Sequence, residues 1–288
     1  MLTELQRLSP ESLIFICFIL GSIVGSFLNV VILRLPKMME NGWKEDCCDL
    51  LEIVQKDKPS PYNLIFPSSH CPKCNHKIRA WENIPMLSYL FLRGKCSGCA
   101  TGISVRYPLV ELATGMLSGF AAWHFGATLA MLLVLVLIWS LITLTMIDID
   151  TQLLPDNITL PLLWLGLIAN CFELFVPLHD AVIGAAAGYL SLWSVFWLFK
   201  LITKKEGMGY GDFKLLAAFG AWLGWQALPL IIILSSFVGA AIGITAIIIQ
   251  GRDKNIPIPF GPYLAIAGLI TLFWGQEISR YYLQISQL

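Results

Sequence analysis

The sequence carries little charge for its length. Only 13% of its 288 residues are Asp, Glu, Lys or Arg, and 57% are hydrophobic, whereas a soluble domain usually carries about 25% charged residues. This shortage excludes a surface that faces water on all sides. Lipid is the alternative solvent, and roughly 20 consecutive apolar residues in a helix cross the hydrocarbon core of a bilayer.

Several patterns that would indicate other functions are also missing. The sequence has no internal repeat of the kind that marks many transporters. It has no Ser–His or Cys–His pattern, and no Rossmann-type Gly-rich turn between residues 36 and 107. The formal net charge is zero, and we expect no nucleic-acid partner.

Long apolar runs are what the sequence does have. They are continuous rather than alternating, which indicates helices and not a barrel. We therefore predict an all-α polytopic membrane protein with about eight transmembrane helices, the first of them retained rather than cleaved as a signal peptide. Glycines four apart inside the runs, such as Gly184 and Gly188, predict close helix packing. The predicted spans are Leu13–Leu35, Pro108–Phe125, Ala127–Ile147, Asn157–Val176, Ala181–Phe199, Phe213–Trp225, Leu228–Ile249 and Phe260–Trp274.

The basic residues predict the orientation. With the N-terminus outside, seventeen of the nineteen Lys and Arg residues fall on the inner side, and only Arg7 and Arg280 fall outside. The positive-inside rule favours this topology strongly over its reverse. The inner residues are Arg34, ten between Lys37 and Arg106, and Lys200, Lys204, Lys205, Lys214, Arg252 and Lys254.

Four cysteines between the first two spans form two C-x-x-C knuckles. They are Cys71 and Cys74, then Cys96 and Cys99. Two such knuckles are typical of a zinc ribbon, in which four thiolates hold a structural Zn²⁺ and leave no open position for a substrate. A redox C-x-x-C is the weaker alternative. We expect a small cytoplasmic zinc-ribbon-like insert that the metal helps to fold, with His70 and His76 as surface residues.

Two aspartates are predicted to share one depth at the inner membrane border. Asp148 ends the third span, and Asp212 begins the sixth after a Gly-rich stretch. Carboxylates placed close together cannot both ionise easily, so they share a proton, as in aspartic proteases.

Simpler interpretations remain open for the acidic residues near this border. Asp156 follows Pro155 and could cap the next helix, and Asp212 could itself be an N-cap. Asp150 lies about 200° around a helix from Asp148 and cannot point at the same partner.

The chain resembles the bacterial type IV prepilin peptidases of the larger, zinc-bearing form, over nearly its whole length. The resemblance adds to the cysteine knuckles and aspartates several motifs in a fixed order. These are Gly25-Ser-Phe-Leu-Asn-Val-Val-Ile32, Arg34-Leu-Pro36, Glu82-Asn-Ile-Pro85, Leu92-Arg-Gly-Lys-Cys96, Ile103-Ser-Val-Arg-Tyr-Pro108 with Glu111, Asp148-Ile-Asp150, Leu154-Pro-Asp156, Gly207-Met-Gly-Tyr-Gly-Asp-Phe-Lys214 and Pro259-Phe-Gly-Pro262.

The resemblance implies a function in the bacterial inner membrane. Members of this family cleave the leader of type IV prepilins and type II secretion pseudopilins after a glycine, on the cytoplasmic side. They then methylate the new N-terminus with S-adenosylmethionine. The implied catalytic residues are Asp148 and Asp212, the implied zinc ligands are Cys71, Cys74, Cys96 and Cys99, and Gly94 is linked to methylation.

The expected domains follow from the spans and the resemblance. Residues 1–35 form an N-terminal transmembrane helix, residues 36–107 a cytoplasmic zinc-binding insert associated with methylation, and residues 108–288 a seven-helix membrane peptidase core. Two other functions stay open from the residues alone. They are an ion-coupled membrane transporter and a membrane-tethered zinc-ribbon scaffold that only binds partners.

Overall fold

The computed structural model describes residues 6–53, 62–205, 207–250 and 259–285. This part of the chain is mostly helical and contains no β-strand, which confirms the predicted helical class. Arg252 and Lys254, which the topology prediction used, lie outside the described residues. The helices are α2 (Pro10–Leu50), η1 (Ala80–Asn83), α3 (Leu87–Phe91), α4 (Arg106–Phe125), α5 (Leu129–Thr151), α6 (Asp156–Asn170), α7 (Leu178–Thr203), α8 (Tyr210–Leu223), η2 (Trp225–Ala227), α9 (Leu228–Gln250) and α10 (Gly261–Ile285).

Four stretches in the described part of the chain are long and apolar enough to cross a membrane. They lie in α2, α5 and α7 and in the stretch Trp225–Thr245, which includes most of α9. Each of the other predicted spans also falls largely on a helix. However, α6 and α8 have only 15 and 14 residues, fewer than the roughly 20 of a full crossing. Eight crossings are therefore not established by helix length and composition.

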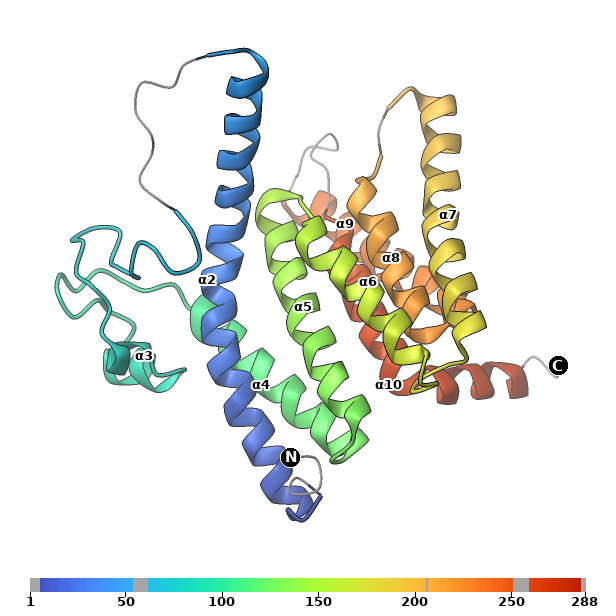
Figure 1. Cartoon of the computed structure of the whole chain (residues 1–288), viewed down its shortest axis with the longest axis horizontal. Coiled ribbons are helices and arrows are strands. Elements are labelled where there is room, and N and C mark those ends of the chain that lie inside the picture. The colour runs from blue at the N-terminus through green and yellow to red at the C-terminus, as the bar shows by residue number, and fades with distance from the viewer. Residues whose placement is uncertain (1–5, 54–61, 206, 251–258, 286–288) are drawn as a thin grey trace. The chain divides into compact units, whose positions relative to one another are not determined.

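The N-terminal unit, Met1–Thr143, is built on the packing of α2 against α4, which lie side by side (Figure 1). Small residues bring the two backbones together. A Cβ atom on Gly21 would lie 2.4 Å from Oγ of Ser118, and one on Gly25 would lie 2.9 Å from Cα of Glu111. Close packing through glycines, predicted from their spacing, is confirmed here.

Helix α2 does not end at the predicted boundary of the insert. It continues through Pro36 to Leu50, into a polar segment in which Glu40 and Lys44 form an ion pair of 2.6 Å one turn apart. Pairs at this spacing stabilise exposed helices. The insert therefore begins as an extension of the first predicted span.

A buried arginine of α2 binds the backbone of the segment at residues 63–67. Arg34, 9% exposed, donates hydrogen bonds to the carbonyls of Asn63 at 2.9 Å and Pro67 at 2.6 Å. Its guanidinium also lies over the ring of Tyr62, 5.9 Å from the centroid. A charged group is seldom buried without such partners, so Arg34 fixes the chain where it returns from the end of α2.

In the C-terminal unit, Leu144–Leu288, helix α8 is almost wholly buried and packs against α6, α7 and α10 (Figure 1). Gly184 of α7 and Gly220 of α8 touch, because a Cβ on Gly184 would lie 2.3 Å from the Gly220 carbonyl oxygen. Trp222 is fully buried and donates its indole N–H to the carbonyl of Leu162 on α6 at 2.9 Å. This packing fixes the C-terminal half of α8 against α6 and α7.

Candidate functional site

The C-terminal end of α5 carries Asp148, which is only 4% exposed. Its oxygen Oδ2 accepts a hydrogen bond of 2.9 Å from the backbone N–H of Gly261, the first residue of α10. A buried carboxylate is costly unless it is hydrogen-bonded or paired. Packing alone therefore does not explain an aspartate at this position.

Asp212 lies in the first turn of α8 and is 6% exposed. Gly209 is the N-cap of this helix, so the interpretation of Asp212 as the N-cap is wrong. The carboxylate instead lies beside Gly209, because a Cβ on that glycine would lie 3.9 Å from Oδ2 of Asp212. Its oxygen Oδ1 is buried without a hydrogen-bond partner among the described residues. Buried polar atoms nearly always have partners, so an unpartnered oxygen sets this carboxylate apart from an ordinary structural one.

The two aspartates lie in one site, although they are 64 residues apart in the sequence. Their carboxylates are in electrostatic contact. Leu154 packs against the starts of both α8 and α10. A Cβ on Gly211 would lie 2.6 Å from Cβ of Leu154, and one on Gly261 would lie 3.1 Å from its Cδ2. The end of α5 and the starts of α8 and α10 thus meet around one buried acidic pair.

The other acidic residues near the pair have different surroundings. Asp150 is exposed while Asp148 is buried, as their angular separation on a helix predicts. Asp156 is not an N-cap, because Pro155 holds that position. The Asp156 carboxylate instead accepts hydrogen bonds from the ammonium group of Lys214 at 2.7 Å.

The two cysteine knuckles of the N-terminal unit share one backbone conformation. In residues 71–76 and 96–101, the N–H of the first cysteine donates to the carbonyl five residues later, at 2.9 and 2.8 Å. The N–H four residues later donates back to the cysteine carbonyl, at 2.9 Å in both. The residue four positions after the first cysteine has a positive φ in both turns, 57° at Asn75 and 55° at Ala100. Each turn therefore presents its two sulfurs on the same side.

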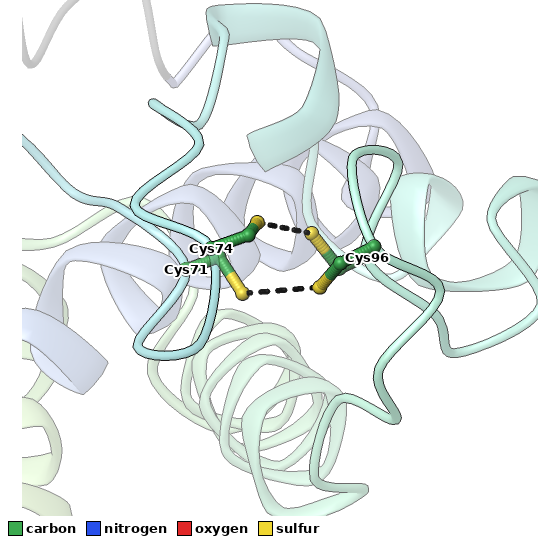
Figure 2. A group of neighbouring side chains, drawn as sticks. Cys71, Cys74 and Cys96 are labelled. Carbon is green, nitrogen blue, oxygen red and sulfur yellow. Dashed lines mark hydrogen bonds between the residues drawn. The ribbon is translucent and has the colours of Figure 1, made fainter.

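The four knuckle sulfurs face one another as a metal site requires (Figure 2). Sγ of Cys71 lies 3.8 Å from Sγ of Cys99, and Sγ of Cys74 lies 3.9 Å from Sγ of Cys96. All four sulfurs lie within 4.8 Å of one another, and all four cysteines are free thiols. A tetrahedral Zn²⁺ with bonds of about 2.3 Å separates its sulfur ligands by about 3.8 Å. The donor set therefore fits Zn²⁺ in size and chemistry.

Glu82 connects the two knuckles, and the sequence analysis did not single it out as a site residue. Its carboxylate accepts hydrogen bonds from the Arg79 backbone N–H at 2.8 Å and the Ser97 hydroxyl at 2.6 Å, and it lies 3.2 Å from Nε2 of His76. These partners, the Arg79 N–H foremost, lower the pKa of Glu82 to about 2. His76 is half-buried here rather than a free surface residue. The only sign of this contact in the sequence is that Glu82 is an acidic residue between the two knuckles.

Gly94 stands two residues before the second knuckle in a conformation that favours glycine. Its φ is +67°, and a Cβ there would lie 2.8 Å from the hydroxyl oxygen of Tyr89. The Gly94 N–H also donates to the Tyr89 carbonyl at 2.8 Å. A larger residue would clash with Tyr89 of α3 and displace the backbone that leads into Cys96.

Comparisons with known proteins identify the family of the chain. Residues 19–125 match the family described as "Bacterial Peptidase A24 N-terminal domain", and residues 135–244 match the "Type IV leader peptidase family". The chain is 59% identical over 277 residues to the Prepilin leader peptidase/N-methyltransferase of Pseudomonas aeruginosa, covering 96% of each chain. The chain belongs to the type IV leader peptidase family.

Other members of the leader peptidase family match the chain almost from end to end. Proteins of the same name from Stutzerimonas stutzeri and Aeromonas salmonicida are 56% and 54% identical to it, covering 99% and 98% of each chain. No solved structure matches the chain. The family membership predicted from the motifs is confirmed, and with its apolar helices it makes the chain an integral membrane enzyme.

Proposed function

We propose that this chain is a membrane aspartic endopeptidase that removes the leader of type IV prepilins, with Asp148 and Asp212 as the catalytic pair. The observation that carries the proposal is that these two carboxylates are both buried in the C-terminal unit and lie close enough for the charge of Asp148 to act on Asp212. Only this pair among the described carboxylates combines burial, mutual electrostatic interaction and an oxygen without a partner. The printed names of the relatives supply the substrate class.

The chemistry follows from the sharing of one proton by the pair. The ionised carboxylate takes a proton from a water molecule, which attacks the carbonyl carbon of the scissile peptide bond. The protonated carboxylate gives its proton to the peptide, and the C–N bond breaks. Because the two groups titrate jointly, neither aspartate is assigned a fixed role.

The membrane arrangement in this proposal has eight spans, with the catalytic pair facing the cytoplasm. Its support is the distribution of basic residues, seventeen of nineteen on one side. The short helix α8 is buried among other helices rather than facing lipid, so it does not need full span length. The apolar helix of a prepilin or a type II secretion pseudopilin would lie in the bilayer of the inner membrane. Its basic leader would remain in the cytoplasm, with the bond after the leader glycine at the depth of the aspartates.

The four knuckle cysteines would hold a structural Zn²⁺ in this proposal. The sulfur distances of 3.8 and 3.9 Å support it. A closed four-thiolate site supplies folding energy rather than an open coordination position. The metal would therefore hold the insert together and take no part in peptide cleavage.

Methylation of the new N-terminus with S-adenosylmethionine is the second proposed activity, resting on the names of the relatives. The described residues contain no strand-to-helix turn of the Rossmann kind, so they do not fit that cofactor cradle. Gly94 lies in the insert against Tyr89, which is consistent with a site in the N-terminal unit. No contact residue or chemical step is assigned to the methyl donor.

The test uses the purified full chain in detergent with a prepilin and S-adenosylmethionine, followed by mass spectrometry of the product. We expect loss of the leader after glycine and addition of one methyl group. Asp148→Asn and Asp212→Asn should each lower the cleavage rate by about 10²- to 10⁴-fold, while exposed Glu173→Gln serves as the control. Normal cleavage by either aspartate variant would refute the catalytic pair and favour a scaffold or transport function.

A further inference from the structure

The start of α10 offers one backbone donor to the acidic pair. Pro262 has no N–H, and the amides of Tyr263 and Leu264 donate to the Phe260 carbonyl at 3.1 and 3.2 Å. The N–H of Gly261 is left, and it donates to Oδ2 of Asp148 at 2.9 Å. The first amides of a helix have no partner within the helix and carry partial positive charge. They suit a carboxylate oxygen.

Glycine is the residue that allows this contact. A Cβ on Gly261 would lie 2.7 Å from Oδ2 and 3.3 Å from Cγ of Asp148. Asp148 has a short side chain on a helix, so its carboxylate cannot give way without leaving the Gly261 amide. The φ angle of Gly261 does not lie in the left-handed region. Space at Asp148, and not backbone conformation, is therefore what demands glycine here.

A second helix start lies beside the other aspartate. Asp212 is in the first turn of α8, and its Oδ2 lies 3.9 Å from the position that a Cβ on Gly209 would take. The backbone hydrogen bond from Gly261 to Asp148 has no counterpart of the same geometry at Asp212 among the described residues, and Oδ1 of Asp212 has no partner there.

We propose that Gly261 is a positioning residue for cleavage, whose amide and missing side chain hold the Asp148 carboxylate in its reactive orientation. The inference rests on the proposed peptidase function. Gly261 does not touch the substrate in this proposal and acts through Asp148 alone. A displacement of about 1 Å in a reacting group can cost about 10²-fold in rate.

Gly261→Ala in the full chain tests the proposal with a prepilin substrate. We expect kcat to fall by about 10²-fold, KM to change little, and the pH profile of kcat to shift, because the hydrogen bond to one member of the pair is lost. Gly275→Ala, in the same helix with only Thr271 near its Cβ at 3.0 Å, is the matched control and should leave kcat and the profile unchanged. A folded Gly261→Ala protein with normal kcat and pH profile would overturn the proposal.

A double-mutant cycle keeps the test decisive if Gly261→Ala unfolds the protein. The melting temperature is measured for Asp148→Ala with and without Gly261→Ala. The proposal expects Gly261→Ala to lower the melting temperature less once the carboxylate is gone, since the tightest contact of the new Cβ, 2.7 Å, is with Asp148, and only the 3.1 Å contact with Leu154 remains. An equal loss of melting temperature in both backgrounds would refute it. Cleavage by Asp148→Asn, measured separately, reports on the proposed function itself.

Discussion

The zinc-knuckle insert and the α8 core hold their functional side chains in opposite ways. Three of the four knuckle cysteines are at least partly exposed, and their positions depend on turns, a polar contact through Glu82 and the proposed metal. The aspartates sit on helices whose buried apolar side chains, such as Phe213 and Trp222, are 0% exposed. A site in a segment with little apolar core depends on polar contacts and metal bonds, whereas a site within packed helices depends mainly on shape, with one backbone hydrogen bond from Gly261 to orient Asp148.

Removal of one thiolate should show the largest difference between the zinc-knuckle insert and the α8 core. In Cys71→Ser we expect loss of bound zinc and unfolding of the knuckles, because structural Zn²⁺ contributes about 10–16 kcal/mol of apparent binding free energy in small zinc domains. The helices around α8 should keep their protection from hydrogen exchange. Metal analysis and segment-resolved hydrogen exchange measure both effects. Unchanged zinc content in the variant would contradict the metal site.

A larger side chain at a helix contact should destabilise the α8 core. Gly184→Val places a side chain against the Gly220 carbonyl, 2.3 Å from the position of Cβ, and overpacking costs typically 1–3 kcal/mol or more. We expect a lower melting temperature with zinc content preserved. Gly102→Ala in the insert, where nothing lies within 4 Å of the added Cβ, is the control. Equal melting temperatures for both variants would argue against shape as the basis of the core.

Glu82→Gln tests the polar contact between the knuckles. The amide of Gln keeps the size of the side chain but cannot accept on both sides as the carboxylate does from Arg79 and Ser97. Loss of such an outer contact lowers metal affinity by about 10- to 100-fold. Competition with a zinc chelator measures the affinity. Wild-type zinc affinity in this variant would show that the turns alone position the sulfurs.

The smallest effect is expected at the exposed ion pair of the C-terminal unit. Lys214 and Asp156 meet at 2.7 Å, but their side chains are 28% and 51% exposed, and solvent-exposed pairs contribute about 0–1 kcal/mol. Lys214→Met should therefore change the free energy of unfolding by less than 1 kcal/mol. Chemical denaturation in detergent measures it. A much larger loss would mean that charge, and not shape alone, stabilises this region.

Most of the fold class could be predicted from apolar runs, because a bilayer permits few alternatives to helices. The end of α2 could not, since the polar segment up to Leu50 is held by helical propensity and the Glu40–Lys44 pair rather than by an apolar pattern. The short helices α6 and α8 also limit what hydropathy decides, because burial by neighbours replaces lipid around α8.

The sequence could predict which side chains form the candidate site, but not the backbone groups that contact them. The spacing of the knuckles indicated a four-sulfur cluster, and the predicted topology put Asp148 and Asp212 at one depth. The donor to Asp148 could not be foreseen, because Gly261 acts through a backbone amide that has no side-chain pattern. Asp156 was misjudged as a cap for a related reason. Its partner Lys214 is 58 residues away in the sequence.

The hydrogen bonds of Arg34 turn the stretch between the membrane part of α2 and residue 63 into a closed detour. The chain leaves at Arg34 and is tied back to the same residue at Asn63 and Pro67, before the first knuckle begins. The entropy of closing a loop changes only slowly with its length. Because Arg34 anchors Asn63 and Pro67 directly, a change in the number of residues between α2 and Asn63 should leave the cysteines in place.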